Sequence, residues 1–207
     1  MMLIGNIFVG MGVSIFKLSG LGNDPFSGMM MALAEVAGIS YAIFAILLNI
    51  VFFAIQLSIG RKLIGLGTII NAILLGYLVT IFYDVWLKIF PPVADNTMFR
   101  VLIVCIGVII CSLGLSLYQT ADTGVAPYDS LAIIMAKRFK KVSYFWCRIS
   151  LDTLCVVACY AGGGIVGLGT LISALGFGPV IHFWDIHFSQ KLLHVRKDTE
   201  GSSHERD

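Results

Sequence analysis

Charged residues are scarce in this chain. Only 13% of its 207 residues are Asp, Glu, Lys or Arg, whereas a soluble domain carries about 25%. With 58% apolar residues and a mean hydropathy of +0.92, the composition excludes a soluble globular enzyme and a disordered chain. The net charge is only +2, and the basic residues do not gather into a nucleic-acid-binding face.

Paired cysteines and catalytic sets are also missing. The five cysteines form no Cys-x-x-Cys pair, and their odd number argues against a disulfide framework. No nucleophile, base and orienting residue occur together, so we expect no enzyme, metal or cofactor. Residues 1–16 lack the basic start of a signal peptide, and no cleavage site follows. We therefore expect the first apolar stretch to stay as a membrane helix.

Long apolar segments fill most of the chain. Each is long enough, or nearly so, to cross the bilayer as a helix, which needs about 20 residues. The six predicted spans are 3–19, 41–60, 63–88, 101–119, 144–162 and 164–187. Two shorter helices are predicted at 25–37 and 127–139. We expect these to be broken or re-entrant, although four crossings per half stay an alternative.

The chain matches itself when it is shifted by 102 positions. Over residues 65–76, seven of twelve positions are identical to their partners. Chance similarity between apolar segments would not keep glycine, proline and threonine in one frame. The recurring motif residues are Gly22, Pro25, Gly65, Gly67 and Thr68 in the first half and Gly124, Pro127, Gly167, Gly169 and Thr170 in the second.

This repeat predicts the organisation of the chain. Three crossings per half would place the second half upside down relative to the first, as in inverted-repeat transporters. The fold class is then an all-α polytopic membrane protein with about six transmembrane helices in two inverted three-helix repeats, each with a short broken or re-entrant helix. The expected divisions are a first repeat at 1–90, an external linker at 91–100, a second repeat at 101–189 and a polar cytoplasmic tail at 190–207.

The basic residues predict the orientation. Arg61 and Lys62 of the first half align with Gly163 and Gly164, and the basic stretch 137–141 aligns with residues 35–39, which include Glu35 and no basic residue. Basic loops lie preferentially in the cytoplasm. We therefore expect both termini and the 137–141 loop to be cytoplasmic and the 90–99 loop to be external.

The Gly-x-Gly-Thr motifs resemble a packing device more than a phosphate loop. Small residues recur every four positions after each motif, a pattern typical of close helix packing in membranes. The sequence predicts two packing stripes: Thr68, Ala72 and Gly76, and Thr170, Ala174 and Gly178.

Together these motifs resemble a known family. Gly22-Asn-Asp-Pro25 after an apolar helix, followed by Gly65-Leu-Gly-Thr68-Ile-Ile-Asn71-Ala-Ile-Leu-Leu-Gly76, is similar to bacterial integral membrane proteins of the YczE/YyaS/YitT type. The resemblance extends from Leu3 to about Asp185. It implies a multi-pass protein of the bacterial cytoplasmic membrane without a known cofactor, and it brings no secure biochemical activity.

Four polar residues are candidate substrate- or ion-binding residues. Asp24 and Asp129 open the short helices, where they serve either as caps or as part of a site for a cation, a proton or a cationic substrate. Asp152 lies in the middle of an apolar helix, where a charge is costly. It either pairs with Arg148, four residues earlier, or forms part of a functional site. Asn49 is its partner in the repeat when one inserted residue is allowed.

The sequence favours a small secondary transporter or exporter of a small molecule or cation. The alternative is a non-transporting membrane factor that assists or scaffolds a biosynthetic or secretion system through its basic 137–141 loop. A membrane enzyme comes third because no catalytic set supports it. The expected partners are the lipid bilayer and a small-molecule substrate, proton or cation, with no nucleic acid. Assembly into a homo-oligomer stays open.

Overall fold

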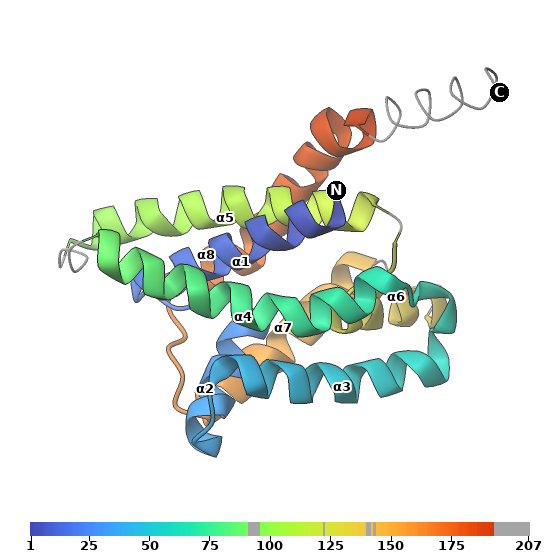
Figure 1. The fold of residues 1–207 in the computed structure, drawn as a ribbon, viewed down its shortest axis with the longest axis horizontal. Coiled ribbons are helices and arrows are strands. Elements are labelled where there is room, and N and C mark those ends of the chain that lie inside the picture. The colour runs from blue at the N-terminus through green and yellow to red at the C-terminus, as the bar shows by residue number, and fades with distance from the viewer. Residues whose placement is uncertain (91–95, 122, 140–141, 143, 193–207) are drawn as a thin grey trace.

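The protein is a bundle of helices. The computed structural model describes residues 1–90, 96–121, 123–139, 142 and 144–192, and every regular element within them is helical. Figure 1 shows the eight α-helices found in this part of the chain, with a π-helical extension of the last one. They are α1 (Met2–Ser19), α2 (Pro25–Ala37), α3 (Tyr41–Ile59), η1 (Arg61–Leu63, 3-10), α4 (Leu66–Ile89), α5 (Thr97–Thr120), α6 (Pro127–Arg138), α7 (Tyr144–Ala161), α8 (Leu168–Trp184) and η2 (Asp185–Ser189, π).

All eight predicted helical segments are present, with ends that agree to within a few residues. Among the described residues, four helices are long and apolar enough to span a membrane: α1, α3, α4 and α5. The other two expected spans fall short of this standard. Helix α7 has Arg148 and Asp152 in its middle, and α8 has 17 residues before its π-helical extension. The all-α membrane fold is therefore confirmed, whereas the count of six spans stays a prediction.

Local sequence explains where the two short helices begin. Pro25 and Pro127 occupy the first helical position, where a missing N–H breaks no helical hydrogen bond. The Asp24 carboxylate accepts a 3.0 Å hydrogen bond from the backbone N–H of Ser27 and so caps α2. Helix α2 ends at Gly38, whose left-handed φ of 67° suits glycine.

The helices form two groups. Helices α1, α4, α5 and α8 pack around one apolar cluster that includes Phe16, Val79 and Val104. Helices α2, α3, α6 and α7 pack around a second cluster that includes Met30 and Tyr128. In Figure 1 the first group lies above and the second below, and contacts between α3 and α4 join them. The candidate site lies between the two groups.

The centre of the first group is the close contact between α1 and α5. Gly5 lies against Gly114 and Tyr118, whereas Phe16, near the other end of α1, lies against Gly107. The two helices therefore run antiparallel. A Cβ atom on Gly5 would lie 2.8 Å from the carbonyl oxygen of Gly114, so only glycine permits this approach.

The Gly-x-x-Pro loop of each half docks on the Gly-x-Gly-Thr motif of the other half. The Gly169 N–H donates to the Leu21 carbonyl at 2.8 Å, and the Gly67 N–H donates to the Thr123 carbonyl at 2.9 Å. Each pair is the other shifted by 102 positions. The loop glycines have left-handed φ values, 101° for Gly22 and 113° for Gly124, and both face a threonine of the opposite motif, Thr170 and Thr68 respectively.

The two predicted packing stripes differ. Gly76 of α4 lies against α3, because a Cβ atom there would come within 3.0 Å of the Ala42 Cα atom. The prediction is wrong for Gly178 of α8, since no heavy atom of the described residues lies within 4 Å of its Cβ position. The physical reason is that α7 and α8 diverge, whereas α3 and α4 pack along each other.

Candidate functional site

The four candidate residues lie around two adjoining cavities. Asp24, Asn49 and Asp129 all line a small interior cavity of about 60 Å³. Asp152 lines a larger cleft of about 740 Å³ between α5, α7 and α8. Leu115, Arg148 and Phe177 contribute to both walls, so the two spaces are neighbours.

Arg148 of α7 connects two of the candidate carboxylates. Its Nη1 atom lies 2.5 Å from Asp129 Oδ1, and its Nε atom lies 3.3 Å from Asp152 Oδ2. The Arg148–Asp152 pair was expected from helical spacing. The contact with Asp129 was not, because it depends on how α6 packs against α7. One guanidinium thus bridges the first turn of α6 and two successive turns of α7.

Two tyrosines complete this cluster. The Tyr118 hydroxyl donates to Asp129 Oδ2, and the Tyr128 hydroxyl donates to Asp152 Oδ1 at 2.7 Å. The Arg148 guanidinium also lies 5.0 Å from the centre of the Tyr128 ring. Neither tyrosine was predicted as a site residue, although the sequence contains a signal for both. Their partners 102 positions earlier are phenylalanines, so the hydroxyl groups occur only in the half that contains the two carboxylates.

Asp24 lies in a different environment from the other two acids. Its side chain is only 8% exposed, and its Oδ1 atom is occupied by the N-cap hydrogen bond. Its buried Oδ2 atom has no hydrogen-bond partner among the described residues. The side chain therefore caps α2 with one oxygen and leaves the other unused at the wall of the small cavity.

Asparagine side chains form another part of the small cavity. Asn49 and Asn71 both line it, and they are 6% and 4% exposed. The Asn49 Nδ2 atom lies 3.4 Å from the Ala72 carbonyl, and the Asn71 amide donates to Asn6 Oδ1 at 2.6 Å. With both NH₂ groups engaged in these contacts, the carbonyl oxygens are what the two side chains can offer to a ligand.

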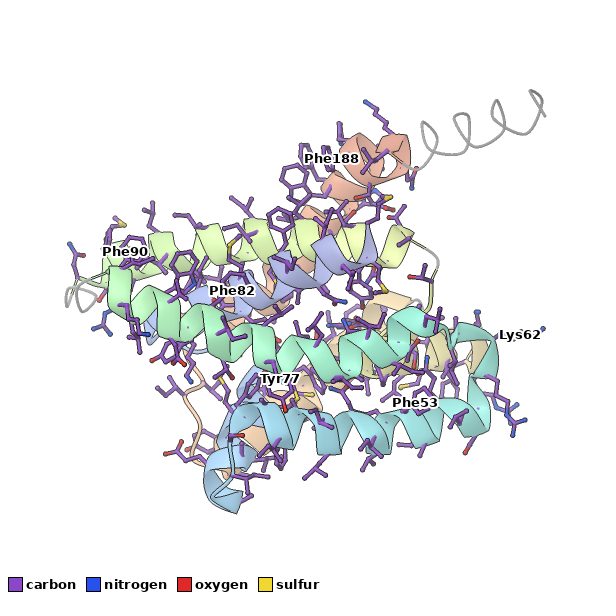
Figure 2. All side chains as sticks on the ribbon, viewed as in Figure 1. Phe53, Lys62, Tyr77, Phe82, Phe90 and Phe188 are labelled. Atoms are coloured by element: carbon purple, nitrogen blue, oxygen red, sulfur yellow. The ribbon has the colours of Figure 1, made fainter. Side chains whose placement is uncertain are left out.

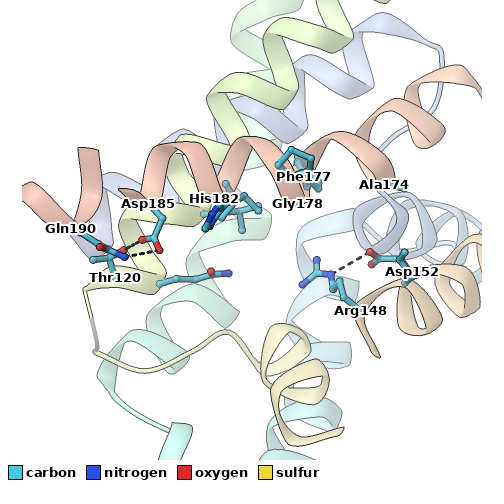
Figure 3. Close-up of a pocket in the computed structure, with 14 residues that line it drawn as sticks. Thr120, Arg148, Asp152, Ala174, Phe177, Gly178, His182, Asp185 and Gln190 are labelled. Carbon is cyan, nitrogen blue, oxygen red and sulfur yellow. Dashed lines mark hydrogen bonds and ion pairs between the residues drawn. The ribbon is translucent and has the colours of Figure 1, made fainter. Parts of the chain in front are cut away.

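The larger cleft has a charged wall on each side. Figure 3 shows Arg148 and Asp152 on one side and a Thr120–Asp185–Gln190 network on the other, with Phe177 and Gly178 between them. Asp185 accepts hydrogen bonds from Thr120 at 2.9 Å and from Gln190 at 3.1 Å. Asp185 thereby lines the cleft at the end of α8. A volume of this size lies within the range of small-molecule sites, about 300–1,000 Å³.

The ten motif residues support the site and do not line it. They hold the two loops that precede α2 and α6, and these loops place Asp24 and Asp129 at the start of their helices. Within the described residues, no group of three or more His, Cys, Asp or Glu side chains could hold a metal ion.

These features define a multi-pass membrane protein with polar cavities inside its bundle. The chain belongs to a family of unknown function, DUF6198, whose model matches residues 1–186. The expected relation to YczE- and YyaS-type proteins is confirmed, whereas the relation to YitT stays a prediction.

Three uncharacterised bacterial proteins are similar to most of this chain. A protein of Haemophilus influenzae is 28% identical over 188 residues, which cover 90% of this chain and 82% of that protein. YyaS of Bacillus subtilis is 25% identical over 194 residues, covering 91% and 94%. YczE of Bacillus subtilis, named as a membrane protein, is 23% identical over 180 residues, covering 86% and 81%. No solved structure is significantly similar.

Proposed function

We propose that this protein is a small secondary transporter or exporter of a small organic cation in the bacterial cytoplasmic membrane. The observation that carries the proposal is the difference between two equivalent helix pairs. Helices α3 and α4 are closed on each other at Gly76, whereas α7 and α8 are separated by a 740 Å³ cleft at Gly178. Transporters built from inverted repeats work by alternating such openings around a fixed site.

The arrangement of the two halves supports inverted repeats. Helices α1 and α5 are 102-position equivalents, and they run antiparallel. The two loop contacts, Gly67 with Thr123 and Gly169 with Leu21, are equivalent in the same way. An exchange of conformations between the halves would close α7 on α8 and open α3 from α4.

The charges of the cleft favour a cationic substrate. Asp152 and Asp185 contribute two carboxylates to the wall, against one guanidinium from Arg148. The Asp129 carboxylate, which faces the small cavity, forms an ion pair with Arg148 and so offsets its positive charge. Phe177 adds an aromatic surface, which suits an organic ammonium group. Such a substrate would bind Asp152 while Arg148 keeps its contact with Asp129.

The proposed orientation places the cleft toward the cytoplasm. The cleft reaches the end of α5 at Thr120, and the start of α1 lies beside this end because Gly5 contacts Tyr118. Lys62 lies toward this end and Phe90 toward the other, as Figure 2 shows. The positive-inside rule then puts both termini and η1 in the cytoplasm.

Disulfide locking tests alternation without knowledge of the substrate. In a cysteine-free background, Ala45→Cys with Gly76→Cys would lock α3 to α4, since a Cβ at Gly76 lies 3.2 Å from the Ala45 Cβ. Ile149→Cys with Gly178→Cys would lock α7 to α8 across the cleft. We expect each pair to crosslink alone, and the first lock to prevent the second. Failure of the cleft pair to crosslink under any condition would contradict alternation.

Transport itself is tested with proteoliposomes on a solid-supported membrane. Primary amines and quaternary ammonium compounds would be applied as a panel, and at least one should produce a current. The Asp152→Asn variant should lose that current. The matched control, Glu35→Gln, changes an exposed carboxylate at the end of α2 and should retain it.

A non-transporting membrane factor is the second candidate. The observation that favours it is the proximity of two basic segments, because Gly60, just before Arg61 and Lys62, lies against Ile134 in the last turns of α6, which end in Lys137 and Arg138. Such a basic surface suits an acidic partner protein. If replacement of these four side chains by alanine abolishes function in cells while Asp152→Asn has no effect, this candidate replaces transport.

A further inference from the structure

Asp24 has an unused carboxylate oxygen inside the bundle. The Ser27 N–H satisfies Oδ1, and the fully buried Oδ2 atom has no hydrogen-bond partner among the described residues. A buried carboxylate oxygen without a partner is costly, because water solvates it strongly in the unfolded chain. A ligand that binds this oxygen in the working protein would offset the cost.

The polar groups that the cavity beside Asp24 offers to a ligand are mainly oxygen atoms. The amide groups of Asn49 and Asn71 are engaged through nitrogen, so their oxygens are available on the same cavity as the carboxylate. A space of about 60 Å³ exceeds the roughly 10–15 Å³ that a single water needs. It is large enough for a small ion together with one or more waters.

The net negative charge of the side chains around this cavity also favours binding of a cation. Asp24, Asp129 and Asp152 lie around a single guanidinium, that of Arg148, so three formal negative charges meet one positive charge. Arg148 is directed at Asp129 and Asp152. These two acids also accept hydrogen bonds from Tyr118 and Tyr128, whereas Asp24 has only the N-cap bond.

We propose that Asp24, Asn49 and Asn71 form a binding site for a monovalent cation of the Na⁺ type. One carboxylate with two amide oxygens is a hard, oxygen-only ligand set. A divalent ion such as Ca²⁺ takes six to eight oxygens, commonly from several carboxylates. The second carboxylate on this cavity, that of Asp129, is already held by Arg148 and Tyr118. Water molecules would complete the coordination shell of the monovalent cation.

Arg148 connects the proposed cation site with the large cleft. The guanidinium lines both spaces, and it holds Asp129 on the small cavity and Asp152 on the cleft. A cation beside Asp24 repels Arg148 and favours its displacement toward Asp152, so the two sites are coupled. The role as a coupling ion rests on the transport proposed above, whereas cation binding itself does not.

Thermal unfolding of the purified full chain in detergent tests the site. NaCl would replace CsCl at constant total salt, so that ionic strength does not change and no organic cation is present. Ligand binding to the folded state raises the unfolding temperature in a saturable way. We expect such a rise with Na⁺ for the wild type and for Glu35→Gln, and none for Asp24→Asn. A Na⁺ response that survives in Asp24→Asn would overturn the site.

A second variant covers the case in which Asp24→Asn does not fold. Asn49→Ala removes one proposed ligand and only a long 3.4 Å hydrogen bond, so it should fold and bind Na⁺ about tenfold more weakly. Unchanged affinity in Asn49→Ala would contradict the ligand set. A wild-type protein that responds to pH but not to Na⁺ at any pH would show that Asp24 takes a proton and would overturn the metal-cation site.

These outcomes are separate from those of the transport experiment. Equilibrium binding of Na⁺ is measured without substrate or membrane, so its absence would leave proton-coupled or uncoupled transport standing. Saturable Na⁺ binding in a protein that produces no current with any ammonium compound would instead leave the site standing and remove its role in coupling.

Discussion

Gly76 and Gly178 occupy equivalent positions 102 residues apart, yet only Gly76 is packed against a neighbouring helix. The difference divides the molecule into a closed side, α3 with α4, and an open side, α7 with α8. Equal sequence motifs have therefore taken unequal structures, which is the arrangement expected of a repeat protein held in one of two related states.

Alanine substitutions at these two glycines should have opposite effects on stability. Gly76→Ala places a methyl group 3.0 Å from the Ala42 backbone, and overpacking of this kind costs about 1–3 kcal/mol. Gly178→Ala meets no neighbouring helix, and because Pro179 follows it directly, its gain in helix propensity stays well below about 1 kcal/mol. Thermal unfolding of both variants in the same detergent provides the comparison. Equal destabilisation by the two changes would contradict the open cleft.

Alanine substitution of a loop glycine should destabilise the protein more than the same substitution at a glycine with a similar backbone angle elsewhere. Gly22 and Gly38 both have left-handed φ values, so alanine pays a strain of about 1–2 kcal/mol at either position. Only Gly22 is also enclosed, because a Cβ there would lie 3.0 Å from the Gly167 nitrogen. We expect Gly22→Ala to lower the unfolding temperature clearly further than Gly38→Ala. If the two variants unfold together, the docking of the loop contributes no stability.

Asp152→Asn should fold. Arg148 keeps its contact with Asp129 in this variant, so the guanidinium is not left without a carboxylate. Arg148→Leu leaves the buried Asp129 and the partly buried Asp152 without their cation, and breaking a buried pair costs about 3–5 kcal/mol. The yield of monodisperse protein and the unfolding temperature should therefore fall in the order wild type, Asp152→Asn, Arg148→Leu. A reversed order for the two variants would show that Asp152, not Asp129, is the main partner of Arg148.

The topology should be visible by thiol labelling in intact cells. In a cysteine-free background, a membrane-impermeant reagent is expected to label Asn96→Cys and not Lys62→Cys. Both residues are exposed, and they lie at opposite ends of α4 and its connection to α5. Permeabilised cells serve as the control, since both variants should then react. Labelling of Lys62→Cys alone in intact cells would invert the proposed orientation.

Local sequence predicted the helices well because their ends are set by neighbouring residues. Asp24 with Pro25, and Ala126 with Pro127, mark helix starts that any tertiary arrangement must respect. The Arg148–Asp152 pair was accessible for the same reason, since both lie on one face of one helix.

The contacts of the site with other helices could not be obtained in this way. Asp129 meets Arg148 only because α6 packs beside α7, and Asp24 shares a cavity with Asn49 only because α2 lies beside α3. The packing prediction for Gly178 was wrong because a small residue permits a close neighbour without specifying that one is present. For locating the polar site, the positions where one half has tyrosine and the other has phenylalanine were more informative than the motifs that the two halves share.

The exchange of loops between the halves has a consequence for biosynthesis. Leu21 and Gly22 are held by residues 167–170, which leave the ribosome roughly 145 residues later. The first loop therefore enters the membrane long before its docking surface exists, and a truncated chain that ends after α4 leaves both of its motifs without partners. Two separately expressed halves should accordingly be degraded alone and rescue each other when they are produced together.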